Sequence, residues 1–306
     1  MTRLPYGVAG LGLGFLHQLA TPATTASSSP STLAGSSRSA PTRAGPDDDP
    51  PPRVTPSALG ASGHTLLPSF LTPEERRVLL RSCRRLPGNP DAAVLPTTAE
   101  PTRGRHHCEL TARFHKDWWR DDCADTSDLR RAVCAVEERA ARAAAPFFAE
   151  LGKRPRMTQL QLLDSLPGSE DQFWHCDNTA QGLTFVIALE DIVDVSGPTE
   201  LLVGTQRLHD PDSGEFLIIP FLTLWMRQTF NGGENIGENG VRLHKAVLQS
   251  RDAFVFDSRT LHRGGANRSS RSRPVVIVRY DPSDHTPPGC GIVATSMLKA
   301  VGKILE

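Results

Sequence analysis

Short apolar runs separated by turn residues fill the second half of the sequence, from Met157 to Tyr280. Runs of this kind, rich in β-branched and aromatic residues, predict short β-strands. The run at 183–189 is almost entirely apolar, which indicates a strand buried on both faces. The other expected strands cover residues 157–163, 173–177, 200–204, 245–248, 253–256 and 275–280. Strands this short and this numerous favour an all-β barrel or sandwich.

His175 and Asp177 stand two positions apart in the expected strand at 173–177. Side chains of a strand alternate between its faces, so these two would point to the same side. An imidazole and a carboxylate on one side can hold a divalent metal ion together. Alone, a His-x-Asp pair is a weak signal, because such pairs also arise by chance.

The third ligand that we predict is His262, which follows the expected strand at 253–256. Two histidines and one carboxylate on one face of an octahedral ion leave the opposite positions open, as in non-haem Fe(II) oxygenases. His244 is the reserve candidate for this position. Ligands split between an early and a late strand fit a mainly β fold with flanking helices. The expected architecture is a double-stranded β-helix, the cupin-like form of the jelly roll.

Arg273 stands at the head of a further apolar run, eleven residues after His262. A guanidinium at this position can bind a carboxylate through a pair of hydrogen bonds. A metal triad followed by such an arginine suggests an Fe(II) enzyme that consumes a 2-oxoacid.

Two helices are expected before the strands. The segment 72–75 (Thr-Pro-Glu-Glu) has the pattern of a helix start, with a threonine cap and a glutamate that can complete a reciprocal cap. A second helix is expected at 127–151, where apolar residues recur at helical spacing and Gly152 follows as a left-handed cap. Pro146 is expected to bend or interrupt its last turns.

The segments between these elements are expected to be loops. Residues 106–108 (His-His-Cys) are interpreted as a surface turn, because no further ligand stands at zinc-type spacing nearby. The long insertion at 210–240 is interpreted as a flap over the substrate. Trp118, Trp119 and Trp225 are expected to shape the substrate pocket.

Residues 1–62 are rich in Ser, Thr, Ala, Pro and Gly, so this segment is predicted to be disordered. Residues 1–46 contain no acidic residue, as in an organelle transit peptide, and a secretory signal is the other interpretation. The apolar stretch at 8–20 is too short to span a membrane, which takes about 20 residues. We expect an intracellular protein, in an organelle if a transit peptide is present. Its catalytic domain is expected at 63–290, followed by a C-terminal tail at 291–306.

Charged residues balance, with 34 Lys and Arg against 34 Asp and Glu. This gives no reason to expect a nucleic-acid or membrane partner, so the expected partner is a small-molecule substrate. The six cysteines include no Cys-x-x-Cys pair. Neither a disulfide framework nor a structural zinc site is therefore expected, and a reducing compartment is favoured. Cys176, between two expected ligands, is interpreted as a packed, unreactive thiol.

These motifs resemble those of the phytanoyl-CoA dioxygenase-like family of Fe(II)/2-oxoglutarate-dependent oxygenases. The resemblance runs from Leu66 to Tyr280, and its most specific part is the closing pattern. The matching segments are residues 70–75, 175–178, 189–191, 197–200 with the following Gly204-Thr205, and 262–269 followed by Arg273. One departure is Gln206, where relatives commonly carry histidine. That position is not a metal position, so the departure concerns the packing around the site.

The resemblance implies an Fe(II) site formed by His175, Asp177 and His262, with 2-oxoglutarate as cosubstrate and O2 in the open positions. Such an enzyme is expected to hydroxylate an unactivated C–H bond of a small molecule and to release succinate and CO2. Lipids and acyl-CoA esters are among the candidate substrates. Halogenating relatives carry a small residue in place of the carboxylate, so Asp177 favours hydroxylation. Ascorbate is expected to maintain the iron.

The resemblance also implies which residues bind the cosubstrate. Arg273 would pair with the distal carboxylate of 2-oxoglutarate, and Arg271 is the alternative. Gln161 would donate a further hydrogen bond, and Gln159 on the same strand face is the alternative.

Two other hypotheses are open at the level of the sequence. One is a non-catalytic jelly-roll binding protein that holds a metal only for structure. The presence of both Asp177 and Arg273 argues against it, since a structural metal site needs no anchor for a 2-oxoacid. The other takes the three arginines at 268–273 as a contact for phosphate or RNA, although they make only a small patch.

Overall fold

The computed structural model describes residues 53–84, 104–110, 124–172, 174–210, 217 and 242–285. The helices are α2 (Pro56–Leu59), η1 (Gly60–Ser62), α3 (Pro73–Arg84), α4 (Ala124–Glu150), η2 (Asp194–Ser196) and η3 (Thr205–Arg207). The strands are β1 (His64–Leu67), β2 (Arg105–Glu109), β3 (Pro155–Ser165), β4 (Leu183–Ala188), β5 (Thr199–Val203), β6 (Arg242–Ala246), β7 (Ala253–Asp257), β8 (His262–Gly264) and β9 (Arg273–Pro282). Among these residues, no helix combines the length and the apolar character needed to cross a lipid bilayer.

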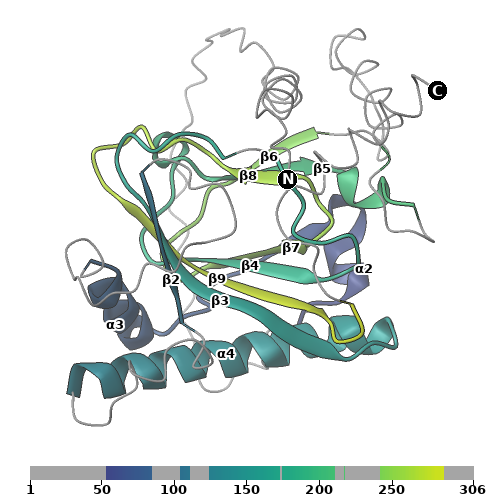
Figure 1. Ribbon diagram of the computed structural model, residues 1–306, viewed down its shortest axis with the longest axis horizontal. Coiled ribbons are helices and arrows are strands. Elements are labelled where there is room, and N and C mark those ends of the chain that lie inside the picture. Colours follow the sequence, from purple (N-terminus) through teal and green to yellow (C-terminus); the bar gives the residue numbers. More distant parts are fainter. Residues whose placement is uncertain are drawn as a thin grey trace, which may run out of the picture.

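The strands form two antiparallel sheets (Figure 1). The larger sheet has the strand order β1-β7-β4-β9-β3-β2, and the smaller sheet has the order β6-β5-β8. From β3 onward the chain passes back and forth between them. Strands β4, β7 and β9 join the larger sheet, while β5, β6 and β8 join the smaller one. This is the jelly-roll arrangement of a double-stranded β-helix, and the predicted fold class is confirmed.

The larger sheet separates two apolar layers, because side chains alternate between its faces. In β4, Leu183, Phe185 and Ile187 belong to the layer shared with the helices. Val186 and Ala188 belong to the layer between the two sheets. All six residues of β4 are buried, as the continuous apolar run predicted.

Helices α3 and α4 cover the outer face of the larger sheet, away from β5, β6 and β8 (Figure 1). Helix α3 begins as predicted. The Thr72 N–H donates to Glu75 Oε2 at 2.9 Å, and the Glu75 N–H donates to Thr72 Oγ1 at 3.2 Å. Arg139 of α4 donates two hydrogen bonds of 2.8 Å to the same Glu75 carboxylate. The reciprocal cap therefore also joins the two helices.

Helix α4 confirms the second predicted helix and differs from the prediction at one point. Gly152 follows it with a left-handed φ of 63°, as expected of a helix cap. The helix is not interrupted at Pro146 but continues to Glu150. Phe147 and Phe148 directly after the proline are buried in the core, and this packing outweighs the loss of one helical hydrogen bond.

Packed structure begins before the predicted boundary at residue 63. Val54 is fully buried, and its N–H donates to the Ala143 carbonyl of α4 at 2.9 Å. Leu59 of α2 is also buried in the core. These two apolar contacts explain why residues 53–62 fold although their composition predicted disorder.

The predictions for residues 1–52, Trp118, Trp119 and the tail at 291–306 lie outside the described residues, as does almost all of the insertion at 210–240 with Trp225.

The interpretation of residues 106–108 as a surface turn was wrong. They lie in β2, which pairs with β3 so that His107 stands opposite Leu163. The sequence of β2 is polar and lacks the apolar alternation that marks a strand. The segment forms a strand because it pairs with β3.

Candidate metal centre

Backbone hydrogen bonds hold His175 and Asp177 against the segment that carries His262. The His175 N–H donates to the His262 carbonyl at 3.0 Å, and the His262 N–H returns a bond of 2.9 Å. The Asp177 N–H donates to the Ser258 carbonyl at 2.9 Å. The expected strand at 173–177 is thus reduced to a single bridge beside β8. This bridge stands where the smaller sheet would have a further strand, and it brings the predicted residues together.

His175, Asp177 and His262 form one cluster, and their candidate ligand atoms all lie within 4.8 Å of one another. His262 Nε2 is 3.7 Å from Asp177 Oδ2, and His175 Nε2 is 4.0 Å from Asp177 Oδ1. Metal bonds to such atoms are about 2.1 Å long, so two ligands of one ion lie at most about 4.2 Å apart. Small side-chain rotations would therefore let the cluster hold one divalent ion. It is the one cluster of this kind in the part of the chain that the structure describes.

The His262 ring is oriented by its own segment. Its Nδ1–H donates to the Thr260 carbonyl at 2.9 Å, which leaves the lone pair on Nε2 for a metal. Burial lowers the pKa of His262 to about 4, although the nearby Asp177 opposes the shift. The imidazole is therefore neutral at pH 7, the form that a metal ligand requires.

Two side chains of the larger sheet hold the Asp177 carboxylate. Thr184 Oγ1 donates to Asp177 Oδ2 at 2.6 Å, and Arg279 Nη1 lies 3.5 Å from Asp177 Oδ1. Burial acts to raise the pKa of Asp177, but His262 and Arg279 outweigh it and lower the pKa to about 2. Neither Thr184 nor Arg279 was predicted. They are cross-strand partners of β4 and β9, a relationship that local sequence does not show.

The reserve ligand predicted from the sequence, His244, lies outside the cluster. The reserve ligand His244 packs its ring against His64 and Phe254, at centroid distances of 4.3 and 5.6 Å, and is not part of the cluster. That alternative was wrong.

Cys176 is fully buried, its Sγ–H donates to the Arg259 carbonyl at 3.2 Å, and burial raises its thiol pKa. The interpretation of Cys176 as a packed thiol is confirmed.

The departure at Gln206 is accommodated by packing. Gln206 is buried and accepts a hydrogen bond of 2.9 Å from the Gly204 N–H. Its amide also fills the space where a Cβ on Gly63 would stand. His209 Nε2–H donates to the Arg259 carbonyl at 2.8 Å.

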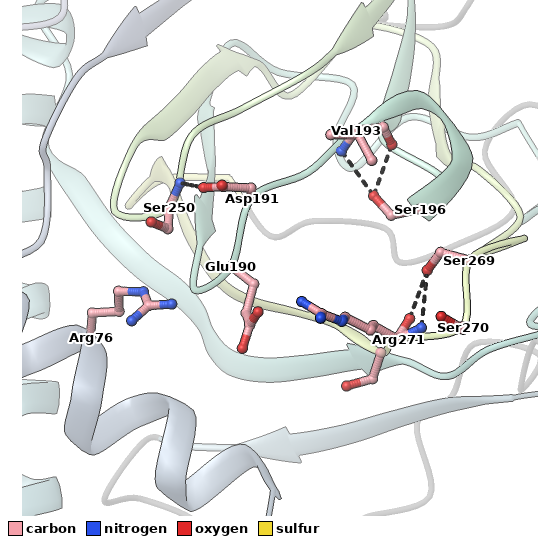
Figure 2. Close-up of a pocket in the computed structure, with 10 residues that line it drawn as sticks. Arg76, Glu190, Asp191, Val193, Ser196, Ser250, Ser269, Ser270 and Arg271 are labelled. Atoms are coloured by element: carbon pink, nitrogen blue, oxygen red, sulfur yellow. Dashed lines mark hydrogen bonds between the residues drawn. The ribbon is translucent and has the colours of Figure 1, made fainter.

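Arg273 and Arg271 occupy different environments. Arg273 is 3% exposed, and its Nη2 donates to Ser165 Oγ at 3.0 Å. Arg271 is exposed and lines a surface cleft of about 310 Å³, together with Glu190 and Arg76 (Figure 2). That cleft contains none of the three candidate ligands. Arg273 is therefore the better candidate for a carboxylate anchor inside the fold, and its burial removes it from the phosphate or RNA patch.

Gln161 lies on the inner face of β3, opposite Ile277 of β9. It is 8% exposed, and its side chain hydrogen-bonds to His107 of β2. Gln159 stands opposite Arg279, next to an irregularity in the pairing of β3 and β9. A role of either glutamine in binding the cosubstrate stays a prediction.

Comparison with known families shows where the chain belongs. The sequence profile of the family described as "Phytanoyl-CoA dioxygenase (PhyH)" matches residues 61–275. The chain belongs to the phytanoyl-CoA dioxygenase family. This family depends on Fe(II) and 2-oxoglutarate, which confirms the predicted cofactors at the level of the family. No curated protein sequence matches the chain significantly.

Solved structures share the fold at low sequence identity. The α-ketoglutarate-dependent epimerase SnoN from nogalamycin biosynthesis has a TM-score of 0.51 at 20% identity, over 74% of this chain and 79% of that one. The carbocyclase SnoK from the same biosynthesis has a TM-score of 0.52 at 19% identity, over 77% and 87%. EctD from S. alaskensis, solved with bound Fe, has a TM-score of 0.52 at 15% identity, over 76% and 77%. These likenesses support the jelly-roll assignment.

Proposed function

We propose that this member of the phytanoyl-CoA dioxygenase family hydroxylates an unactivated C–H bond of a small molecule, using Fe(II), 2-oxoglutarate and O2. The observation that carries the proposal is the cluster of His175, Asp177 and His262, whose candidate ligand atoms lie within 4.8 Å of one another. Two imidazoles and one carboxylate suit Fe(II) and leave positions open for the cosubstrate and O2.

The residues around the cluster would orient its ligands. The Thr260 carbonyl fixes the tautomer of His262, and the Thr184 hydroxyl holds one oxygen of Asp177. Such outer contacts set both the direction and the basicity of metal ligands. The site is largely shielded from solvent, since the side chains of Asp177 and His262 are 12% and 9% exposed. A shielded site protects a reactive iron from side reactions with water.

Arg273 would bind the distal carboxylate of 2-oxoglutarate. Among the described residues its guanidinium donates one hydrogen bond, to Ser165, and its Nε is buried with no partner. A buried guanidinium with spare donors is costly unless an anion joins it. A carboxylate fits these donors, because it can accept a pair of parallel N–H bonds.

When bound, iron and the cosubstrate supply the oxidation. One atom of O2 enters the substrate C–H bond as a hydroxyl, and the other enters 2-oxoglutarate, which becomes succinate and CO2. The chain's own residues position both molecules. The intact carboxylate of Asp177 supports hydroxylation over halogenation, which in related enzymes accompanies its replacement by a small residue.

The test must identify the reaction product, because two solved structures with this fold are named as an epimerase and a carbocyclase. Purified protein with Fe(II), 2-oxoglutarate and ascorbate would be incubated with pooled lipids, acyl-CoA esters and small metabolites. We expect one compound to gain one oxygen atom that originates from isotopically labelled O2. Asp177→Ala should give no such product. Conversion of a compound without oxygen gain would contradict hydroxylation, and metal binding with no turnover would favour the non-catalytic binding protein.

A further inference from the structure

Two buried arginines from different strands converge on one serine. Arg105 of β2 and Arg273 of β9 each stand opposite Ser165 of β3. Cross-strand partners point to the same face of a sheet. Leu163, two residues before Ser165, belongs to the apolar layer between the sheets. The three side chains therefore form one row inside the jelly roll.

The Ser165 hydroxyl accepts hydrogen bonds from both guanidiniums. Arg105 Nη1 donates to Ser165 Oγ, and Arg273 Nη2 donates to the same atom at 3.0 Å. Exposure is 8% for Arg105, 0% for Ser165 and 3% for Arg273. With both oxygen lone pairs occupied, the hydroxyl proton must point away from the two arginines. The row thus offers a third donor beside the two cations.

The described residues compensate the two charges only in part, since Asp171 and Asp164 act on Arg105 and Arg273 from beyond ion-pair distance. Arg263, another buried arginine, pairs with Glu200 at 2.7 Å. Neither Arg105 nor Arg273 forms an ion pair with a described carboxylate, and the Nε of each is buried without a partner. Burial lowers the pKa of Arg273 to about 9 and that of Arg105 to about 10. An anion between them would offset the cost of burying two like charges.

The row also lies at a suitable distance from the metal cluster. Arg105 Nη2 donates to the carbonyls of Gly264 and Gly265 at 3.1 and 2.8 Å. Gly264 is two residues after His262 on β8. Two residues of extended chain span about 7 Å, comparable to the length of a five-carbon dicarboxylate. A molecule bound through one end at a metal ion that His262 would help to hold could therefore reach this row with its other end.

We propose that Arg105 binds the distal carboxylate of 2-oxoglutarate together with Arg273 and the Ser165 hydroxyl. The inference rests on the proposed function and adds a specificity-determining residue to it. With two guanidiniums and a hydroxyl in one row, the site selects 2-oxoacids that carry a second carboxylate. A 2-oxoacid without that group, such as 2-oxobutyrate, leaves both cations without an anion in direct contact.

Arg105 also supports the chain around β8, because it bonds the carbonyls of Glu170, Gly264 and Gly265. A purely structural role would weaken the binding of every ligand alike. The discriminating quantity is therefore the ratio of the dissociation constants for 2-oxobutyrate and 2-oxoglutarate. This ratio changes only if Arg105 acts on the distal carboxylate.

The experiment is anaerobic titration calorimetry of the full chain loaded with Mn(II) in place of iron, using both 2-oxoacids. Arg105→Gln should weaken 2-oxoglutarate binding by about 10- to 100-fold, the worth of a charge-assisted hydrogen bond, while 2-oxobutyrate binding stays within about twofold. Arg105→Lys should recover part of the ratio, because it keeps the charge but loses the planar fork. The matched control is Arg139→Gln, which removes a half-buried arginine bound to Glu75 far from the site and should keep the wild-type ratio.

A wild-type ratio in Arg105→Gln would overturn the inference. If that variant does not fold, Ser165→Ala provides the same test through the shared hydroxyl, and an unchanged ratio there would overturn it equally. The variant Arg273→Ala distinguishes a failure of the role of Arg105 from a failure of the proposed function. Loss of 2-oxoglutarate binding in Arg273→Ala, with a wild-type ratio in Arg105→Gln, would refute only the role of Arg105. Absence of 2-oxoglutarate binding by the wild-type protein would refute the proposed function as well.

Discussion

His175 and His262 exchange a pair of backbone hydrogen bonds of 3.0 and 2.9 Å, and their ring centroids lie 4.3 Å apart. The bridge is isolated, yet it fixes the register between the segment with Asp177 and the start of β8. A slip of one residue would turn the side chains to the other face. The geometry of the candidate metal centre therefore depends on this pair of backbone contacts, together with the bond from the Asp177 N–H to the Ser258 carbonyl.

Thr184→Val should weaken Fe(II) binding, because it removes the hydroxyl that donates to Asp177 Oδ2 at 2.6 Å while keeping the shape of the side chain. Loss of such an outer contact typically costs about 10- to 100-fold in metal affinity or activity. Anaerobic titration with Fe(II) measures the effect. Thr184→Ser, which keeps the hydroxyl, is the matched control, and equal affinity of Thr184→Val and wild type would refute this role.

Arg273→Ala should raise the 2-oxoglutarate concentration needed for half-maximal turnover by orders of magnitude and leave Fe(II) affinity unchanged, because Arg273 contacts none of the three candidate ligands among the contacts described. Arg271→Ala is the matched control, since Arg271 lines the surface cleft of Figure 2. Steady-state kinetics with varied 2-oxoglutarate distinguish the two. A large effect of Arg271→Ala with none of Arg273→Ala would move the anchor to Arg271.

The stability of the metal-free protein should fall as the pH drops from 6.5 to about 4. Burial lowers the pKa of His262 from 6.5 to about 4. In that window the unfolded chain binds a proton at His262 that the folded chain does not, so acid favours unfolding. The contribution is fully present above pH 6.5 and amounts to about 3 kcal/mol.

Urea unfolding of wild type and His262→Gln at a series of pH values isolates this contribution from that of other histidines. The comparison should stay above pH 4, because Asp177 titrates between 3.8 and about 2. A pH dependence equal in the two proteins would contradict the assignment.

Cys176 should resist alkylation in the folded protein, whereas Cys134 should react. Cys176 is fully buried and its thiol pKa is raised by burial, while Cys134 on α4 is exposed. Only the thiolate reacts readily, so both accessibility and ionisation protect Cys176. Peptide mass spectrometry after iodoacetamide treatment, with a urea-unfolded control, measures this difference. Rapid labelling of Cys176 in the native protein would contradict this prediction and show that the segment from His175 to Asp177 opens to solvent.

The sequence was informative where a signal is local. Apolar runs located β4, β7 and β9, and the Thr72 to Glu75 pattern located the start of α3, because the residues themselves carry the burial or capping chemistry. Three ligand candidates were found because metal sites demand particular residue types.

Other features depend on partners distant in sequence. Strand β2 is polar and becomes a strand through its pairing with β3. Thr184 and Arg105 gain their roles through register, with Thr184 opposite Arg279 and Arg105 opposite Ser165. No local pattern in a single sequence distinguishes such residues from other polar strand positions.

Oxygen-dependent release of succinate from 2-oxoglutarate would show that the cluster of His175, Asp177 and His262 supports an oxidation. Wild type and Asp177→Ala would be compared in the presence of Fe(II), ascorbate and the pooled candidate substrates, with and without O2. We expect succinate from the wild-type protein only when O2 is present, and none from Asp177→Ala. Equal succinate release by both proteins, or release by neither while the wild type binds Fe(II), would contradict an Fe(II)/2-oxoglutarate oxygenase function.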